Sequence, residues 1–385
     1  MPNGRPDHRV VRAGVSYYSQ GMTKHSPEPQ PVCAEPLRAW LKEAVDLGAS
    51  DLHLVAGHPP VLRLHGELQE LASPVLDSNA ISGLLLPLSP SHALERFQVD
   101  KNVDFALELT LASCARRFRA NYFLSGQQMG ACFRVIPAHI PDLAWAGFPD
   151  DLAQRLAHFR NGLVLISGVA GSGKTTTLAM IIQLLNQEGG YRMVTVEEPV
   201  EYLFPQVPGS LVSQREVGLD VHTFADGLKY ALRQDPDVIL AGEIRDHDTA
   251  QMALSAAETG HLVFSTLHTR DAKGAISRYA DLFPQEAQRE IRSQLSLSLR
   301  AVVSQHLLPS LRRGDKRVLA LEVMFNNAPI ASAIRFGKIE SIDNNILTGR
   351  GEGMITLDES IRKLFKEQRI SRETAERFIS SPDRL

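Results

Sequence analysis

The spacing of hydrophobic and polar residues changes twice along the first part of the chain. Residues 1–36 are rich in Pro, His, Ser and other polar residues and offer little to bury, which is typical of a mobile extension. From Leu37, LRAWLKEAVDLG has helical spacing, and SDLHLVAG then alternates apolar and polar residues as a strand does. The strand-like segments PPVLRLHGEL and RRFRANYFLSGQQMGACFRVIP follow. We therefore expect a small α+β domain over 37–140.

A second pattern begins near residue 150. Four short apolar runs, GLVLISG, RMVTVE, DVILAGE and HLVFSTLH, alternate with helical segments, which predicts an α/β fold with a mainly parallel sheet covered by helices. The rest of the chain reads as mostly helical, with a hairpin near LLPSLRRGDKRVLALEVM. The predicted parts after the first domain are a linker at 141–150, an α/β domain over 151–345 and a C-terminal helical segment over 346–385.

Composition narrows the class of protein. The 385 residues are more than one domain usually holds, and a net charge of −3 argues against a protein that coats nucleic acid, so no direct nucleic-acid partner is expected. Three scattered cysteines suggest neither a disulfide framework nor a zinc site. No apolar run has the length of a membrane span or a signal peptide. We expect a cytoplasmic protein that reaches a membrane only through partners.

The segment GVAGSGKT fits the phosphate-loop pattern and stands between a predicted strand and a predicted helix, as that pattern requires. Its glycines allow backbone N–H groups to turn toward phosphate oxygens, and the helix N-terminus adds its dipole. Lys174 is expected to reach the outer phosphates of ATP, and Thr175 to hold Mg²⁺. The predicted nucleotide-binding residues are Gly168, Gly171, Ser172, Gly173, Lys174, Thr175 and Thr176.

Charged residues follow three of the predicted strands. Glu243 ends DPDVILAGE, where a carboxylate can orient Mg²⁺, directly or through water, or polarise the attacking water. His261 and His268 stand at the two ends of HLVFSTLH; His268 can sense the terminal phosphate, and His261 either does the same or packs. The segment VTVEEPVEYLF places three carboxylates, Glu197, Glu198 and Glu201, after another buried strand. Residue type and spacing leave open which of the three does chemistry.

These segments, in this order, resemble the secretion and pilus superfamily of hexameric ATPases. The phosphate loop is its Walker A motif, 197–201 its Asp box, AGEIRD its Walker B motif and 260–269 its His box. GASDLHLVAGHPPVLRLHGEL, FRVIP and GMITLDESI extend the resemblance over roughly 37–378. The chain is most similar to the PilT/PilU-type retraction ATPases of type IV pili, whose relatives in secretion usually carry a four-cysteine zinc subdomain. The resemblance implies a RecA-like P-loop ATPase core, a PAS-like N-terminal domain and a helical C-terminal region.

The resemblance also implies residue roles. Glu201 is the general base, with Glu197 and Glu198 as alternatives, and Glu243 supports Mg²⁺. Arg117, Arg119 and Arg134 resemble the arginines that reach the nucleotide of a neighbouring subunit in these rings. The catalytic set is therefore Glu201, Glu243, Lys174, His268, Arg117, Arg119 and Arg134.

The sequence departs from the family pattern at three places. Glu198 stands where Asp is usual, and Gln127 stands where a further arginine is common. The stretch PIASAIRF, residues 329–336, occupies the place of the retraction motif A-I-R-N-L-I-R-E. These departures bear on whether the chain retracts pili independently.

The function that the resemblance implies is a homohexameric, Mg²⁺- and ATP-dependent motor for pilus retraction and twitching motility. Its expected partners are an inner-membrane pilus platform protein and a paralogous pilus ATPase, and it would lie in the cytoplasm, peripheral to the inner membrane. Two alternatives stay open: an ATPase of a type IV secretion or conjugation channel, and a weakly hydrolysing accessory or regulatory nucleotide-binding ring.

Overall fold

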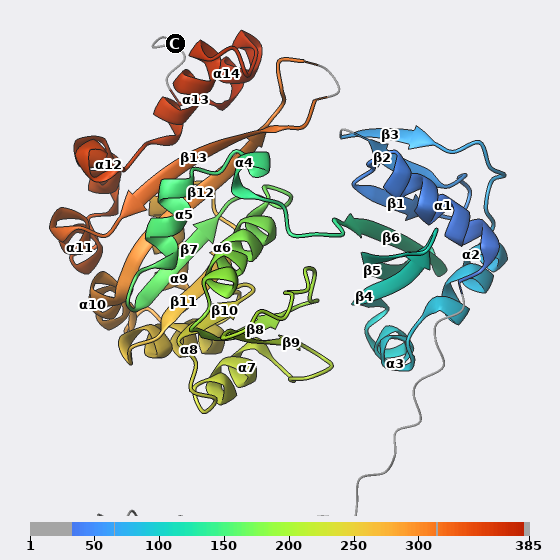
Figure 1. Ribbon diagram of the computed structural model, residues 1–385, viewed down its shortest axis with the longest axis horizontal. Helices are drawn as coiled ribbons and strands as arrows, with labels where there is room; N and C mark the ends of the chain where they lie inside the picture. The colour runs from blue at the N-terminus through green and yellow to red at the C-terminus, as the bar shows by residue number, and fades with distance from the viewer. Residues whose placement is uncertain (1–32, 65, 313–314, 381–385) are drawn as a thin grey trace, which may run out of the picture.

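A computed structural model describes residues 33–64, 66–312 and 315–380 of the chain. The predicted extension 1–36 falls mostly outside the described residues, and the first helix begins at Glu35 rather than at Leu37. Figure 1 shows two bodies joined by the segment that follows β6: one is built on a six-stranded sheet, the other on a seven-stranded sheet. Among the described residues, no helix has the length and apolarity needed to cross a membrane.

The first body is an antiparallel sheet with strand order β3-β2-β1-β6-β5-β4. Alternation along β5 buries Phe118, Ala120 and Tyr122 on one face and leaves Arg117 and Arg119 on the other. The buried face forms a hydrophobic cluster of its own, separate from that of the second body. The elements are α1 (Glu35–Asp46), β1 (Asp51–Leu54), β2 (Val61–Leu64), β3 (Glu67–Glu70), α2 (Ser78–Leu85), η1 (Leu86–Leu88), α3 (Ser91–Asp100), β4 (Asn102–Leu111), β5 (Cys114–Ser125) and β6 (Gln128–Ile136).

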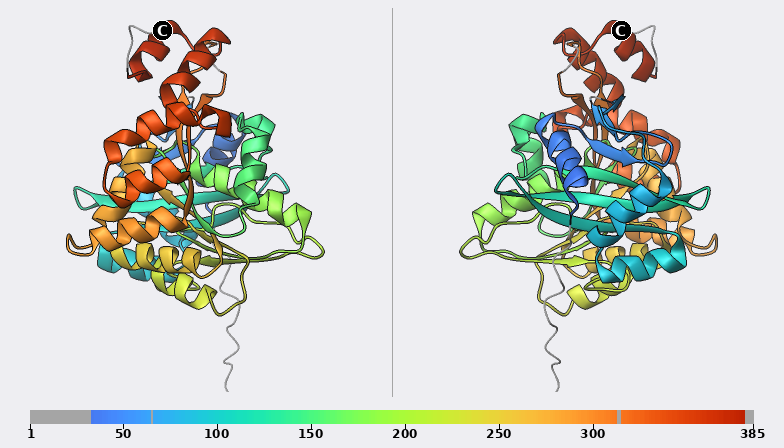
Figure 2. Two further views of the ribbon diagram at one scale, coloured as in Figure 1. Left: turned by 90° about the vertical axis from the view of Figure 1, so that its left-hand side faces the viewer. Right: turned by 90° about the vertical axis from the view of Figure 1, so that its right-hand side faces the viewer.

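The second body is a sheet with strand order β13-β12-β7-β11-β10-β8-β9, parallel except for β13. Strands β7, β10 and β11 are buried along their whole length, as expected for central parallel strands. Helices α5 and α6 lie on one face, α8 and α10 on the other (Figure 2). The elements up to β11 are α4 (Leu143–Ala146), α5 (Asp150–Ala157), β7 (Gly162–Ser167), α6 (Lys174–Glu188), β8 (Arg192–Glu197), β9 (Leu211–Glu216), α7 (Phe224–Ala231), β10 (Val238–Ala241), α8 (His247–Glu258) and β11 (Leu262–Leu267).

The C-terminal part continues with helices and the predicted hairpin. Strands β12 and β13 pair antiparallel, and α13 and α14 form a small apolar cluster with residues of this hairpin. The elements are α9 (Ala272–Asp281), α10 (Gln288–Ser298), β12 (Leu299–Leu308), β13 (Val318–Phe325), α11 (Ala328–Arg335), η2 (Ile339–Ser341), α12 (Ile342–Thr348), η3 (Gly349–Glu352), α13 (Leu357–Lys366) and α14 (Arg372–Phe378).

Two strands, β4 and β9, were not predicted. The sequence of β9, LVSQRE, has only two apolar residues, and β9 pairs with one strand alone, β8, at the edge of the sheet. An edge strand with one covered side needs few apolar residues, so its hydrophobic pattern is weak.

Candidate functional site

The phosphate loop connects β7 to α6 at the carboxyl edge of the sheet. Gly168, Gly171 and Gly173 have φ of 149°, 74° and 89°, a region that favours glycine. A side chain at Gly168 would also clash with Ser172. Helix α6 begins at Lys174 without a side-chain cap, so the first N–H groups of the helix are available to an anion.

Lys174 is 8% exposed and is folded onto the loop. Its Nζ donates to the carbonyl oxygens of Gly168 (2.8 Å) and Val169 (3.2 Å). Burial lowers the pKa of Lys174, and the negative charge of Glu243 opposes that shift. The buried Ser172 hydroxyl has no hydrogen-bond partner among the described residues, so this hydroxyl is available to bind a ligand.

Glu243 follows β10, which lies one strand away from β7 across β11. Its Oε1 pairs with Arg245, while its buried Oε2 has no hydrogen-bond partner in the described part of the chain and lies 3.4 Å from Nε2 of His268. Burial lowers the pKa of His268, and the charge of Lys174 lowers it further. The structure therefore brings Lys174, Glu243 and His268 together, whereas His261 lies at the opposite end of β11 and contacts the carbonyl of Ala256.

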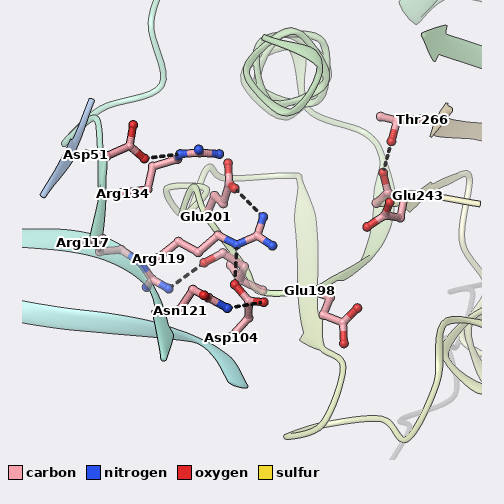
Figure 3. Close-up of polar contacts among 12 residues, drawn as sticks. Asp51, Asp104, Arg117, Arg119, Asn121, Arg134, Glu198, Glu201, Glu243 and Thr266 are labelled. Carbon is pink, nitrogen blue, oxygen red and sulfur yellow. Dashed lines mark hydrogen bonds and ion pairs between the residues drawn. The ribbon is translucent and has the colours of Figure 1, made fainter. Parts of the chain in front are cut away.

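The three carboxylates after β8 have different surroundings. Glu197 is 7% exposed and accepts hydrogen bonds from Thr195 (2.6 Å) and Gln214 (3.3 Å), and burial raises its pKa to about 7. Glu198 lies 3.6 Å from Nη1 of Arg245. Glu201 pairs with Arg119 at 3.6 Å (Figure 3).

Burial also raises the pKa of Glu201, against the lowering effect of the Arg119 and Arg134 charges. A carboxylate whose pKa lies closer to neutral is a stronger base than an ordinary one. Glu201 has its charged partner, Arg119, on the first body, whereas Glu197 is held by hydrogen bonds from Thr195 and Gln214 of the second body.

The arginines of the first body face the segment between β8 and β9, residues 198–210, which carries Glu198 and Glu201 and is called the acidic loop (Figure 3). Arg119 and Arg134 are directly opposite each other on β5 and β6, and Asp104 (3.1 Å from Arg119) and Asp51 (3.0 Å from Arg134) offset their repulsion. Arg117 donates to the carbonyl oxygen of Val200 at 2.9 Å. Arg117 and Arg119 thus contact the core of their own chain, and the reach of these arginines to a neighbouring subunit stays a prediction.

Mg²⁺ suits the residues at this edge. Thr175 is exposed at the start of α6, and one buried oxygen of Glu243 has no hydrogen-bond partner among the described residues. Within the described ranges, no cluster of three or more His, Cys, Asp or Glu side chains could hold a metal ion by itself. Mg²⁺ is usually held by one or two protein groups together with substrate phosphates and water, and Thr175 and Glu243 could supply such groups.

Sequence reasoning missed the residues that support the acidic loop. Tyr202 is hydrogen-bonded to Thr176 through its hydroxyl (3.0 Å), and Gln214 and Glu216 of β9 bond to backbone groups of the loop. The signal available was the alternation of Gln214 and Glu216 in a segment that was not predicted as a strand.

The fold and the site together define a P-loop nucleotide-binding α/β protein. The sequence model of the family described as "Type II/IV secretion system protein" matches residues 28–334, so the chain belongs to this family. The predicted membership in the secretion and pilus ATPase superfamily and the predicted fold class are confirmed, while the PAS-like class of the first body stays a prediction.

Two relatives and one solved structure give the family more detail. The chain is 39% identical to the Type IV pilus retractation ATPase PilT of Pseudomonas aeruginosa over 87% of this chain and 96% of that protein. It is 33% identical to the Type IV pilus ATPase PilU of the same organism over 87% of this chain and 86% of that protein. A crystal structure of the pilus retraction motor PilT with bound ADP superimposes with a TM-score of 0.77 at 39% identity, covering 91% of this chain and 98% of that one.

Proposed function

We propose that this chain is an ATP-hydrolysing motor subunit that powers type IV pilus retraction. The observation that carries ATP hydrolysis is the meeting of Lys174, Glu243 and His268 at one edge of the sheet, with an acidic loop beside them. The purpose of that hydrolysis rests on the 39% identity to a pilus retraction ATPase over 96% of that protein's length.

In the proposed reaction, the phosphate loop binds the phosphates of ATP through its backbone N–H groups. Lys174 exchanges its two loop carbonyls for phosphate oxygens, which compensates its buried charge. Glu201 accepts the proton of the attacking water, and His268 contacts the terminal phosphate region beside Glu243. Thr175 and Glu243 would hold Mg²⁺, directly or through water, and the ion would neutralise charge on the phosphates.

Movement between the two bodies would control the reaction. Arg119 pairs with Glu201, and Arg117 holds the peptide group just before it, so a shift of the first body displaces the base. A change of about 1 Å in the position of a catalytic group can lower the rate about 100-fold. We propose that such shifts pass around a homohexamer in which Arg117, Arg119 and Arg134 also act near the nucleotide of a neighbouring subunit.

The proposed setting is the cytoplasmic face of the inner membrane, where the ring would act on a platform protein of the pilus machine. A paralogous pilus ATPase is a further proposed partner, because the chain is 33% identical to PilU as well as 39% identical to PilT.

A weakly hydrolysing accessory ring is the second candidate function. One observation favours it. The altered retraction motif, residues 329–336, forms most of helix α11 and ends at Phe336, which lies directly after that helix and is 70% exposed. A charged residue of the family motif is thereby replaced by an exposed apolar one.

Steady-state ATP hydrolysis by the purified, size-fractionated protein and its Glu201→Gln variant tests the proposal. We expect turnover by the parent ring and a loss of about 10²–10⁴-fold in the variant, with ATP binding retained, because Gln keeps the shape of Glu but accepts no proton. A parent that binds ATP as a ring but barely hydrolyses it would support the accessory function. Equal turnover in both proteins would move the base to Glu197, Glu198 or Glu243.

A further inference from the structure

The segment between β8 and β9, residues 198–210, has no regular secondary structure and carries Glu201. Backbone groups in such a segment need partners, since buried unpaired N–H and C=O groups are costly. Around Glu201, side chains of β9 supply several of those partners. The acidic loop is therefore held by side chains, not by a strand ladder.

Gln214 makes the most extensive of these contacts. Its Oε1 accepts from the N–H of Phe204 at 3.0 Å, and its Nε2 donates to the carbonyl of Tyr202 at 2.7 Å. A residue of a parallel strand would bond in the same way to the residues on either side of Leu203. Nε2 also lies 3.3 Å from Oε1 of Glu197, so one amide joins the loop to the end of β8.

Glu216 makes the matching contact on the other side of Glu201. Its Oε2 accepts from the N–H of Val200 at 3.0 Å, and Arg117 donates to the carbonyl of the same residue. Glu216 is 8% exposed, so this hydrogen bond is shielded from water. Gln214 and Glu216 are two residues apart in a strand and therefore share one face of the sheet.

We propose that Gln214 and Glu216 are positioning residues for the reaction: they hold backbone groups on both sides of Glu201 and thereby set where its carboxylate meets the attacking water. This inference rests on the proposed function, in which Glu201 is the base. Tyr202 extends the support to the phosphate side, because its hydroxyl lies 3.0 Å from that of Thr176, next to the predicted Mg²⁺ residue Thr175.

Removal of the Gln214 amide should act on the rate and not on binding. In Gln214→Ala, the backbone groups of Tyr202 and Phe204 lose their partner, so the loop is expected to shift. The phosphate loop keeps all its own contacts. We expect kcat to fall about 100-fold, as for a misplacement of about 1 Å, while KM for ATP changes less than about twofold.

The test compares Gln214→Ala, the isosteric Gln214→Glu and the control Ser213→Ala in the full-length ring. Gln214→Glu keeps the acceptor for Phe204 but removes the donor to Tyr202 without opening a cavity, so its loss of rate does not depend on a packing defect. Ser213 lies on the other face of the same strand and should leave kcat unchanged. Steady-state kcat and KM are measured together with binding of a non-hydrolysable ATP analogue.

A double-mutant cycle separates positioning from general structural damage. Single-turnover hydrolysis of labelled ATP is compared for Gln214→Ala in the parent and in the Glu201→Gln background. We expect a loss in the parent and no further loss when Glu201 is already replaced. Equal losses in both backgrounds, or full activity of Gln214→Ala, would overturn the inference and leave the proposed function intact. A parent without any turnover would overturn the proposed function, and this inference with it.

Discussion

The two edges of the seven-stranded sheet carry similar residue types but place them in different surroundings. Strand β11 has a histidine just outside each end: His268 at the carboxyl edge lies 3.4 Å from Glu243 and near Lys174, and His261 at the amino edge contacts the carbonyl of Ala256. The same side chain thus faces a charged, partly unsatisfied site at one end and a satisfied backbone group at the other.

The difference follows from the direction of the parallel strands. Each crossover helix begins at the carboxyl edge, so the N-termini and their partial positive charge gather there. At that edge, the Ser172 hydroxyl and one Glu243 oxygen have no hydrogen-bond partner among the residues that the structure describes. At the amino edge, His158 is bonded to Gln154 and Glu188. Position relative to the sheet, more than residue type, determines which charges are available for chemistry.

In the comparison of the two edges, the largest expected difference comes from replacing the buried cation at the carboxyl edge. In Lys174→Gln, the terminal phosphates lose the charge that stabilises the transition state, and we expect kcat/KM for ATP to fall at least about 10²–10³-fold. Arg160→Gln, an exposed cation at the amino edge, is the matched control and should leave ATP hydrolysis unchanged. Comparable losses in the two variants would contradict the inference that only the carboxyl edge takes part in ATP hydrolysis.

The two histidines that flank β11 should differ in their effect on kcat, by less than the two cations do. His268→Gln removes one ring that contacts Glu243 and the expected phosphate position, and we expect kcat to fall about tenfold, the value of one hydrogen bond to a charged group. His261→Gln should change kcat less than about twofold, because its contacts are to Ala256 in α8 and to Thr259 directly after that helix. Steady-state hydrolysis at one pH measures both; an equal loss would assign His261 a role near the nucleotide as well.

Much of this arrangement could be predicted because local patterns carry it. The apolar runs of β7, β10 and β11 predict buried parallel strands, and the glycines of the phosphate loop mark positive φ. The carboxyl ends of parallel strands meet at one edge, so the convergence of Lys174, Glu243 and His268 follows from chain direction.

The supports of the acidic loop could not be predicted in the same way. Gln214 and Tyr202 come together only because an edge strand of weak hydrophobic pattern returns beside β8. Arg117 reaches Val200 across the space between the two bodies, a contact between residues 83 positions apart in the chain. Alternation in β5 predicts the face on which Arg117 lies but not what that face contacts.

The smallest expected effect lies at the amino edge and concerns stability alone. Hydrogen bonds to the Gln154 carbonyl and the Glu188 carboxylate raise the pKa of His158, so its protonated form stabilises the folded state. This contribution is fully present below the unfolded pKa of about 6.5 and is lost as pH rises through the higher folded value.

His158→Gln should therefore lower stability at pH 5.5 and have no effect at pH 9. The side chain of His158 is 43% exposed, so solvent screening limits the loss to a few tenths of a kcal/mol, roughly the size of an exposed ion pair. Thermal unfolding of the parent and the variant at both pH values measures it, and Glu188→Gln, which removes the negative charge beside His158, should show the same pH dependence. An effect of equal size at pH 9, or a loss of ATP hydrolysis, would mean that the amino edge does more than stabilise the fold.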